Sequence, residues 1–195
     1  MKYLFILPLI IVTACSNAQG PKAALKKDFV AMNQALLDQN FDKVVEYMAE
    51  EVFMLVPEGV MIESLYDMMN SPENELVLSL PSAISIDKIE KSGDQYYGII
   101  EAQFEQKVRY TATDGTVRTL DDPFIAQSLA AFKQALGEEN VRYEKETNFM
   151  VMNVKQKSIA VSANGTTDWQ FIILDPSTLA EMKDILPASV LERAK

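Results

Sequence analysis

The most constraining feature of this 195-residue chain is a long run of alternating side chains between Tyr96 and Thr111. Small or apolar residues take every second position, with Gln106 as the exception, and mostly charged or polar residues lie between them. The small or apolar set is Tyr96, Gly98, Ile100, Ala102, Phe104, Val108 and Tyr110. A period of two is typical of a strand with one buried and one wet face. The pattern therefore predicts an antiparallel sheet that is covered on one side.

Helical patterns lie on both sides of this strand. An apolar stripe with a period near 3.6 predicts an N-terminal helix, and its members are Leu25, Phe29, Met32 and Leu36. Further helices are expected after Asn40, over 61–69 and after Asp175-Pro176. A helix inserted near 122–136 is predicted because Asp122 suits its N-cap and Gly137 its end. The expected fold class is therefore α+β, with N-terminal helices on a curved antiparallel sheet, an inserted helix and a C-terminal helix.

Shorter strands are expected on either side of the inserted helix. One is predicted at 52–56 and another at 83–91, before the long strand. After the inserted helix, strands are expected at 148–154 and 158–163, separated by a polar turn at Lys155-Gln156-Lys157. Asn164-Gly165 favours a type I′ turn into a last strand at 167–174.

The first residues have the features of a secretory signal that ends at a cysteine. Lys2 precedes an apolar run that is shorter than the ~20 residues needed to span a membrane. The tetrapeptide Val12-Thr13-Ala14-Cys15 resembles the lipobox of bacterial lipoproteins. The resemblance implies that the Cys15 thiol is diacylglycerated and that acyl chains anchor the protein in the membrane. An ordinary signal peptide that happens to contain a cysteine is the alternative.

The lipobox resemblance also implies where the mature chain begins and where it is located, and the length of the remainder suffices for one domain. Residues 1–14 are expected to be the signal peptide, 15–22 the lipidated cysteine and a polar tether, and 23–195 a single α+β domain. Ser16 follows the cysteine in place of the aspartate that retains lipoproteins at the inner membrane. The expected location is therefore the bacterial cell envelope, at the outer membrane.

Composition restricts the chemistry of the domain. The net charge is −10, which disfavours nucleic acid as a partner. The chain has no histidine, and Cys15 is its only cysteine. The commonest general base, the commonest metal ligand and thiolate chemistry are therefore missing, and neither a metal nor a cofactor is expected.

The order of elements resembles the nuclear-transport-factor-two-like cone fold, which includes SnoaL-like proteins and ketosteroid isomerase. Three stretches carry this resemblance: 35–45, Asp168-Trp169-Gln170-Phe171-Ile172, and Ile185-Leu186-Pro187. The resemblance implies an apolar pocket between the sheet and its helices. A different layout of helices on an antiparallel sheet, cystatin-like or lipocalin-related, is the alternative.

Four residues are candidates for lining such a pocket. Tyr96 and Tyr110 lie on the apolar face of the long strand, where either hydroxyl could donate to a ligand. Asp168 and Trp169 could form a pocket mouth. Each also has a simpler interpretation, as a core tyrosine or a polar strand residue. The paired carboxylates along the chain lack the spacing of a calcium loop and are explained by solvation or capping.

Two functions remain open from the sequence. The favoured one is a lipoprotein that binds a small apolar ligand or an envelope protein without catalysis. The alternative is an isomerase, dehydratase or hydrolase that uses a tyrosine and a buried carboxyl group. The outer face of the sheet is in addition a candidate surface for a homodimer.

Overall fold

The computed structural model describes residues 20–195, apart from the side chains of residues 176 and 177. Within this range the chain combines helices with one seven-stranded antiparallel sheet, in the order β1-β4-β6-β5. Strands β2 and β3 also pair with β4, and β7 pairs with β6. The expected α+β class is confirmed.

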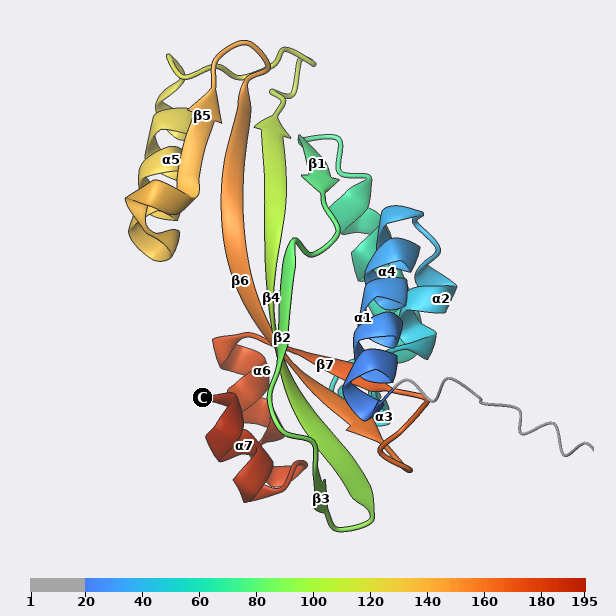
Figure 1. The fold of residues 1–195 in the computed structure, drawn as a ribbon. Helices are drawn as coiled ribbons and strands as arrows, with labels where there is room; N and C mark the ends of the chain where they lie inside the picture. The colour runs from blue at the N-terminus through green and yellow to red at the C-terminus, as the bar shows by residue number, and fades with distance from the viewer. Residues whose placement is uncertain (1–19) are drawn as a thin grey trace, which may run out of the picture.

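Two long strands run through the whole sheet, and the other elements attach to them (Figure 1). They are β4 (Gln95–Tyr110) and β6 (Phe149–Ser162), paired from Tyr96↔Ser162 to Val108↔Met150. Along β4 lie β3 (Glu90–Ser92), β2 (Ala83–Ile86) and β1 (Asn74–Leu78) in succession. Along β6 lie β7 (Gln170–Leu174) and β5 (Val141–Glu144). The long alternating strand is therefore confirmed.

The predicted turn at Lys155-Gln156-Lys157 is wrong, because β6 continues through it. These three residues pair with Gln103, Ala102 and Glu101 of β4. A polar triplet can remain extended here because the neighbouring strand satisfies its backbone groups.

The N-terminal helices are α1 (Pro21–Leu37), α2 (Phe41–Glu46), α3 (Glu50–Phe53) and α4 (Glu58–Met69). The predicted stripe of α1 is buried at Leu25, Phe29 and Met32, which pack with Ile100 and Phe171 in one core cluster. The strand expected at 52–56 is wrong. This segment instead makes local bonds of a helical turn, such as Val56 N–H to the Val52 carbonyl.

The C-terminal helices cover the opposite face of the sheet from α1, as Figure 1 shows. They are α6 (Pro176–Glu181), the 3₁₀ turn η2 (Met182–Asp184) and α7 (Ala188–Ala194). Met182 and Val190 pack there with Tyr97, Ile99 and Ile159. The prediction of one wet face is therefore wrong for the first third of β4, where residues 97–100 are buried on both faces.

The inserted helix is confirmed as α5 (Pro123–Leu136), and it builds a second core at the far end of the long strands. The Asp122 carboxylate accepts from Phe124 N–H at 2.9 Å, and Gly137 ends the helix with φ +95°. The 3₁₀ turn η1 (Glu138–Asn140) leads into β5. Partly buried apolar side chains of α5 pack on this distal cluster, which consists of Val108, Val141, Met150 and Met152.

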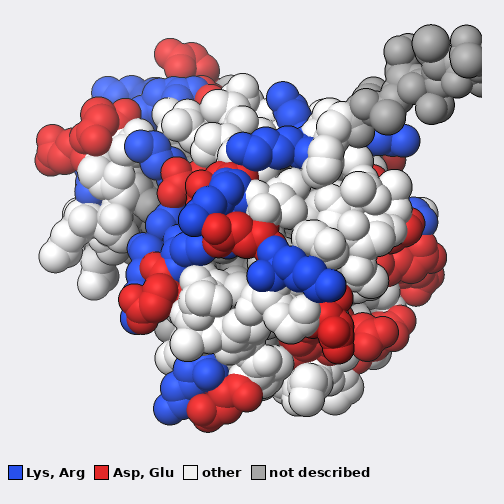
Figure 2. Space-filling view, turned by 60° about the horizontal axis from the view of Figure 1, so that its bottom comes forward, with Lys and Arg blue, Asp and Glu red and all other residues white. Residues whose placement is uncertain are grey.

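The uncovered face of the distal half carries charged side chains that pair with each other. Arg142 Nη2 lies 3.1 Å from Glu105 Oε2, Lys157 pairs with Glu101, and Arg109 pairs with Glu75. On the face seen in Figure 2, basic side chains likewise lie among acidic ones.

Within residues 20–195, none of the helices combines the length and the apolar character needed to cross a bilayer.

Candidate functional site

An apolar groove lies between the N-terminal helices and α5, over the sheet face that both cover. It consists of two adjoining hollows of about 260 Å³ and 450 Å³. We call them the proximal and the distal hollow. Leu76 and Gln106 line both, so the two hollows meet at these residues. Their sizes fall near or within the range of small-ligand sites.

The floor of the groove follows from strand register. Phe104 pairs with Val154, and Gln106 lies between Leu78 of β1 and Met152 of β6. Because side chains of paired residues in an antiparallel sheet point to the same face, these side chains line one surface. The alternation that predicted β4 therefore also builds the floor.

The walls of the groove are helical and soft. The proximal hollow is lined by α1, through Met32 and Leu36, and by α4, through Leu65 and Met68. The distal hollow is lined by α5, through Phe132, Ala135 and Leu136. No residue of α4 is buried, and Met68 is 41% exposed. Methionine side chains adapt readily to the shape of an apolar ligand.

The polar groups of the groove are few and uncharged. No Asp, Glu, Lys or Arg is among the residues that line either hollow. Within residues 20–195, the half-buried side-chain amides of Gln106 and Gln156 have no hydrogen-bond partner. By contrast, Asn33 donates to the Phe29 carbonyl, and Ser79 accepts from Glu105 N–H. An apolar groove with two free amides can hold and orient a ligand.

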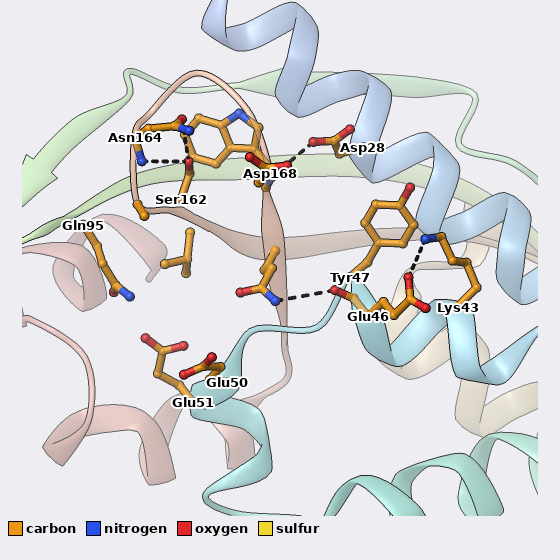
Figure 3. A pocket seen from close by; sticks show the side chains of 14 residues that line it. Asp28, Lys43, Glu46, Tyr47, Glu50, Glu51, Gln95, Ser162, Asn164 and Asp168 are labelled. Atoms are coloured by element: carbon orange, nitrogen blue, oxygen red, sulfur yellow. Dashed lines mark hydrogen bonds and ion pairs between the residues drawn. The ribbon is translucent and has the colours of Figure 1, made fainter.

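Asp168 and Trp169, two of the four predicted pocket residues, lie together in a different, acidic hollow of about 570 Å³ (Figure 3). Its other carboxylates come from α1, α2 and α3: Asp28, Glu46, Glu50 and Glu51. Several of its carboxylates already have partners in the fold. Asp28 accepts from the backbone N–H of Trp169 at 3.1 Å, and Glu46 pairs with Lys43.

The acidic hollow therefore lies mainly where the N-terminal helices join the segment that leads into β7. Asp168 has a positive φ of 55° and accepts from the Thr167 hydroxyl, and the Trp169 side chain is 1% exposed within the core. Across residues 20–195, no group of three or more acidic, histidine or cysteine side chains is arranged to hold a metal ion.

The two predicted tyrosines lie near opposite ends of β4, so they cannot share a ligand-sized pocket. Tyr96 packs against Gly165 and lines none of the three hollows described above. Tyr110 lines the distal hollow and packs edge-on against Phe124, with ring centroids 5.1 Å apart. Burial raises the pKa of the Tyr110 hydroxyl further above neutrality, so this group stays protonated and can donate a hydrogen bond.

The pKa shifts of the carboxyl groups do not favour acid–base catalysis. A catalytic acid of the expected kind needs a carboxyl pKa that burial has raised. In residues 20–195 the shifts run downward, at Asp87, Asp114 and Asp122. In each case the leading cause is a hydrogen bond donated to the carboxylate by a neighbouring residue.

Sequence reasoning found part of the groove. It placed Gln106 on the apolar face of the long strand, but it assigned Gln156 to a turn and did not predict β1. The short apolar run Leu76-Val77-Leu78 after the turn signal at Asn70-Ser71-Pro72 was the available signal for β1. Cys15 lies outside the described residues.

The chain matches no protein-family model, and no curated protein is significantly similar to it.

Proposed function

We propose that this chain is a bacterial envelope lipoprotein, anchored through acyl chains on Cys15, whose domain binds an apolar ligand without catalysis. The observation that carries the ligand-binding part is the groove, with its uncharged lining and its two unpaired glutamine amides. The anchoring part is supported by the tetrapeptide Val12-Thr13-Ala14-Cys15. An apolar segment of an envelope protein is the other occupant that this lining would suit.

The cone fold is part of the same proposal. Helices over one face of an antiparallel sheet, with a hollow between them, support it. The helix α5, inserted between β4 and β5, adds a second wall to that hollow.

Ligand binding is tested with a neutral apolar dye, N-phenyl-1-naphthylamine, whose fluorescence rises in an apolar site. All variants are made in a chain that begins at Ser16, which lacks both Cys15 and the apolar run of residues 4–12, so that neither an acyl chain nor the signal segment competes. We expect Leu76→Glu to weaken dye binding by about tenfold or more, because it places a charge where the two hollows meet.

The matched control for the dye experiment is Val77→Glu, one residue further along β1. Val77 is 41% exposed and points to the opposite face. It should change dye affinity by less than about twofold, since exposed substitutions have small effects. Equal losses in both variants, or no dye binding to the parent protein, would contradict the proposal.

Anchoring is tested by mass spectrometry of the protein extracted from membranes. We expect a mature chain that begins at Cys15 and carries the mass of a diacylglyceryl group, in the outer-membrane fraction. Cys15→Ala should lose this mass and remain uncleaved, because only a thiol can form the thioether. The neighbouring Ser16→Ala is the control and should still be acylated. A wild-type mature chain that begins after Cys15 and carries no lipid would refute the anchor.

A further inference from the structure

We infer that the groove binds a neutral single-chain lipid, with an uncharged ester or hydroxyl head in the proximal hollow and its acyl chain in the distal hollow. This inference rests on the proposed function and adds the chemical class of the ligand. Three observations carry it: the length of the groove, the absence of charge in its lining, and the distribution of its polar groups.

The groove has the length and shape for a chain-like molecule. Its lining extends from Gln156, which pairs with Ala102, to Tyr110 at the end of β4. Eight residues of strand correspond to about 26 Å at ~3.3 Å per residue. The acyl chains of one bilayer leaflet occupy about half of a hydrocarbon core that is ~30 Å thick. One extended acyl chain with a small head therefore fits along the groove.

The lining disfavours a fatty-acid anion. Burying a carboxylate is costly unless a cation or several donors pair with it, and no lysine or arginine lines either hollow. The two nearest basic residues in sequence, Lys155 and Lys157, flank Gln156 on β6. Successive strand residues point to opposite faces, so both lysine side chains point away from the groove, and they line a separate hollow that Gln156 also borders. The ligand head should therefore be neutral.

The polar groups are concentrated at one end of the groove. Gln106, Gln156, Asn33 and Ser79 all line the proximal hollow. The polar side chains of the distal hollow are Gln106, where the two hollows meet, and Tyr110 at the far end. Each glutamine amide offers two donors and one acceptor, which match the carbonyl and hydroxyl groups of a glycerol ester. A ligand without such groups would leave both amides buried and unpaired.

The experiment measures displacement of N-phenyl-1-naphthylamine from the same chain that begins at Ser16. The competitors are 1-monopalmitoylglycerol, palmitate at a pH where it is ionised, and an extended apolar peptide. We expect the glyceride to displace the dye at a concentration at least about tenfold lower than palmitate. The double variant Gln106→Leu/Gln156→Leu should lose this preference while it still binds the dye.

The control for the double variant is Gln103→Leu, on the same strand but on the opposite face of the sheet. It should retain the preference for the glyceride. Palmitate binding as tightly as the glyceride would overturn the neutral-lipid inference and leave the proposed function intact. Displacement by the peptide but not by the glyceride would overturn it in favour of a protein partner. If the parent protein binds no dye, the proposed function itself fails.

Discussion

Phe171→Ala is expected to destabilise the protein by about 3–5 kcal/mol, the range for removing a buried phenylalanine ring. Phe171 lies in β7 with 0% of its surface exposed. Its ring meets Phe29 of α1 edge-on, with centroids 5.3 Å apart, so it joins the first helix to the sheet. Its backbone also bonds with Tyr47 and Ala49, and alanine would keep those bonds. The loss should therefore report the cavity left by the ring.

The measurement for Phe171→Ala is urea unfolding, compared through the midpoint and the slope. Domains of this size are stable by about 5–15 kcal/mol, so a large part of the total would be lost. Phe124→Ala is the matched control, because Phe124 is 46% exposed and its main aromatic partner is Tyr110. It should cost about 1 kcal/mol. Equal costs for the two variants would contradict the packing described for α1 and β7.

Gly165→Ala is expected to cost about 2–5 kcal/mol from two separate sources. Gly165 has φ +71°, a conformation that costs a residue with a side chain about 1–2 kcal/mol. A Cβ atom at this position would also lie 2.6 Å from Cδ1 and 2.7 Å from Cγ of the Tyr96 ring. The second distance involves Cγ, which moves only if the Tyr96 side chain leaves its χ1 rotamer or β4 shifts. The steric part should therefore add to the backbone part.

A double-mutant cycle separates the two sources. In a Tyr96→Ala background the steric part disappears, and Gly165→Ala should then cost only about 1–2 kcal/mol. Gly93→Ala provides a second comparison, because Gly93 has φ +62° and no atom within 4 Å of its hypothetical Cβ. It should resemble the background value. If Gly165→Ala costs the same with and without the tyrosine ring, the close contact does not exist in solution.

The structure around Gly165 also shows why its turn was predicted incorrectly. A type I′ turn needs positive φ at both central residues, and here Gly165 has it but Asn164 does not. The Asn164 side chain instead accepts from Thr166 N–H and Thr167 N–H, which widens the loop. An Asn-Gly pair thus favours two turn geometries, and side chains further along the loop decide between them.

Local sequence patterns predicted best those elements whose conformation does not depend on pairing with a distant segment. The alternation of β4, the stripe of α1 and the cap and end of α5 are properties of a single segment, and all three are confirmed. β6 depends on β4, because its polar middle becomes a strand only when the neighbouring strand pairs with it. The burial of Tyr97 and Ile99 depends on helices almost a hundred residues later. The continuous apolar run at 96–100 was the one local sign of burial on both faces.

In the candidate site, too, the residues that a single strand places were predictable, and those that strand pairing places were not. Gln106 was visible as a polar residue in an apolar series, because that series belongs to one strand. Gln156 and Leu76 join it only through the register of β6 and β1 with β4. Register depends on pairing between distant segments, and a single sequence seldom fixes it. The groove could therefore be expected in kind, as a hollow under helices, but not in its lining.

Because α5 builds a second, smaller core, the molecule has two regions that differ in local stability. The main contacts of α5 are with β5, β6 and η1, and β1, β4 and β6 are the strands that join its core to the larger one. This arrangement allows the region around α5 to unfold locally while the larger core stays folded. Amide hydrogen exchange should then be faster in α5 than in β7. The groove is lined from both sides of this division. A bound ligand would therefore contact both regions at once and couple their local unfolding.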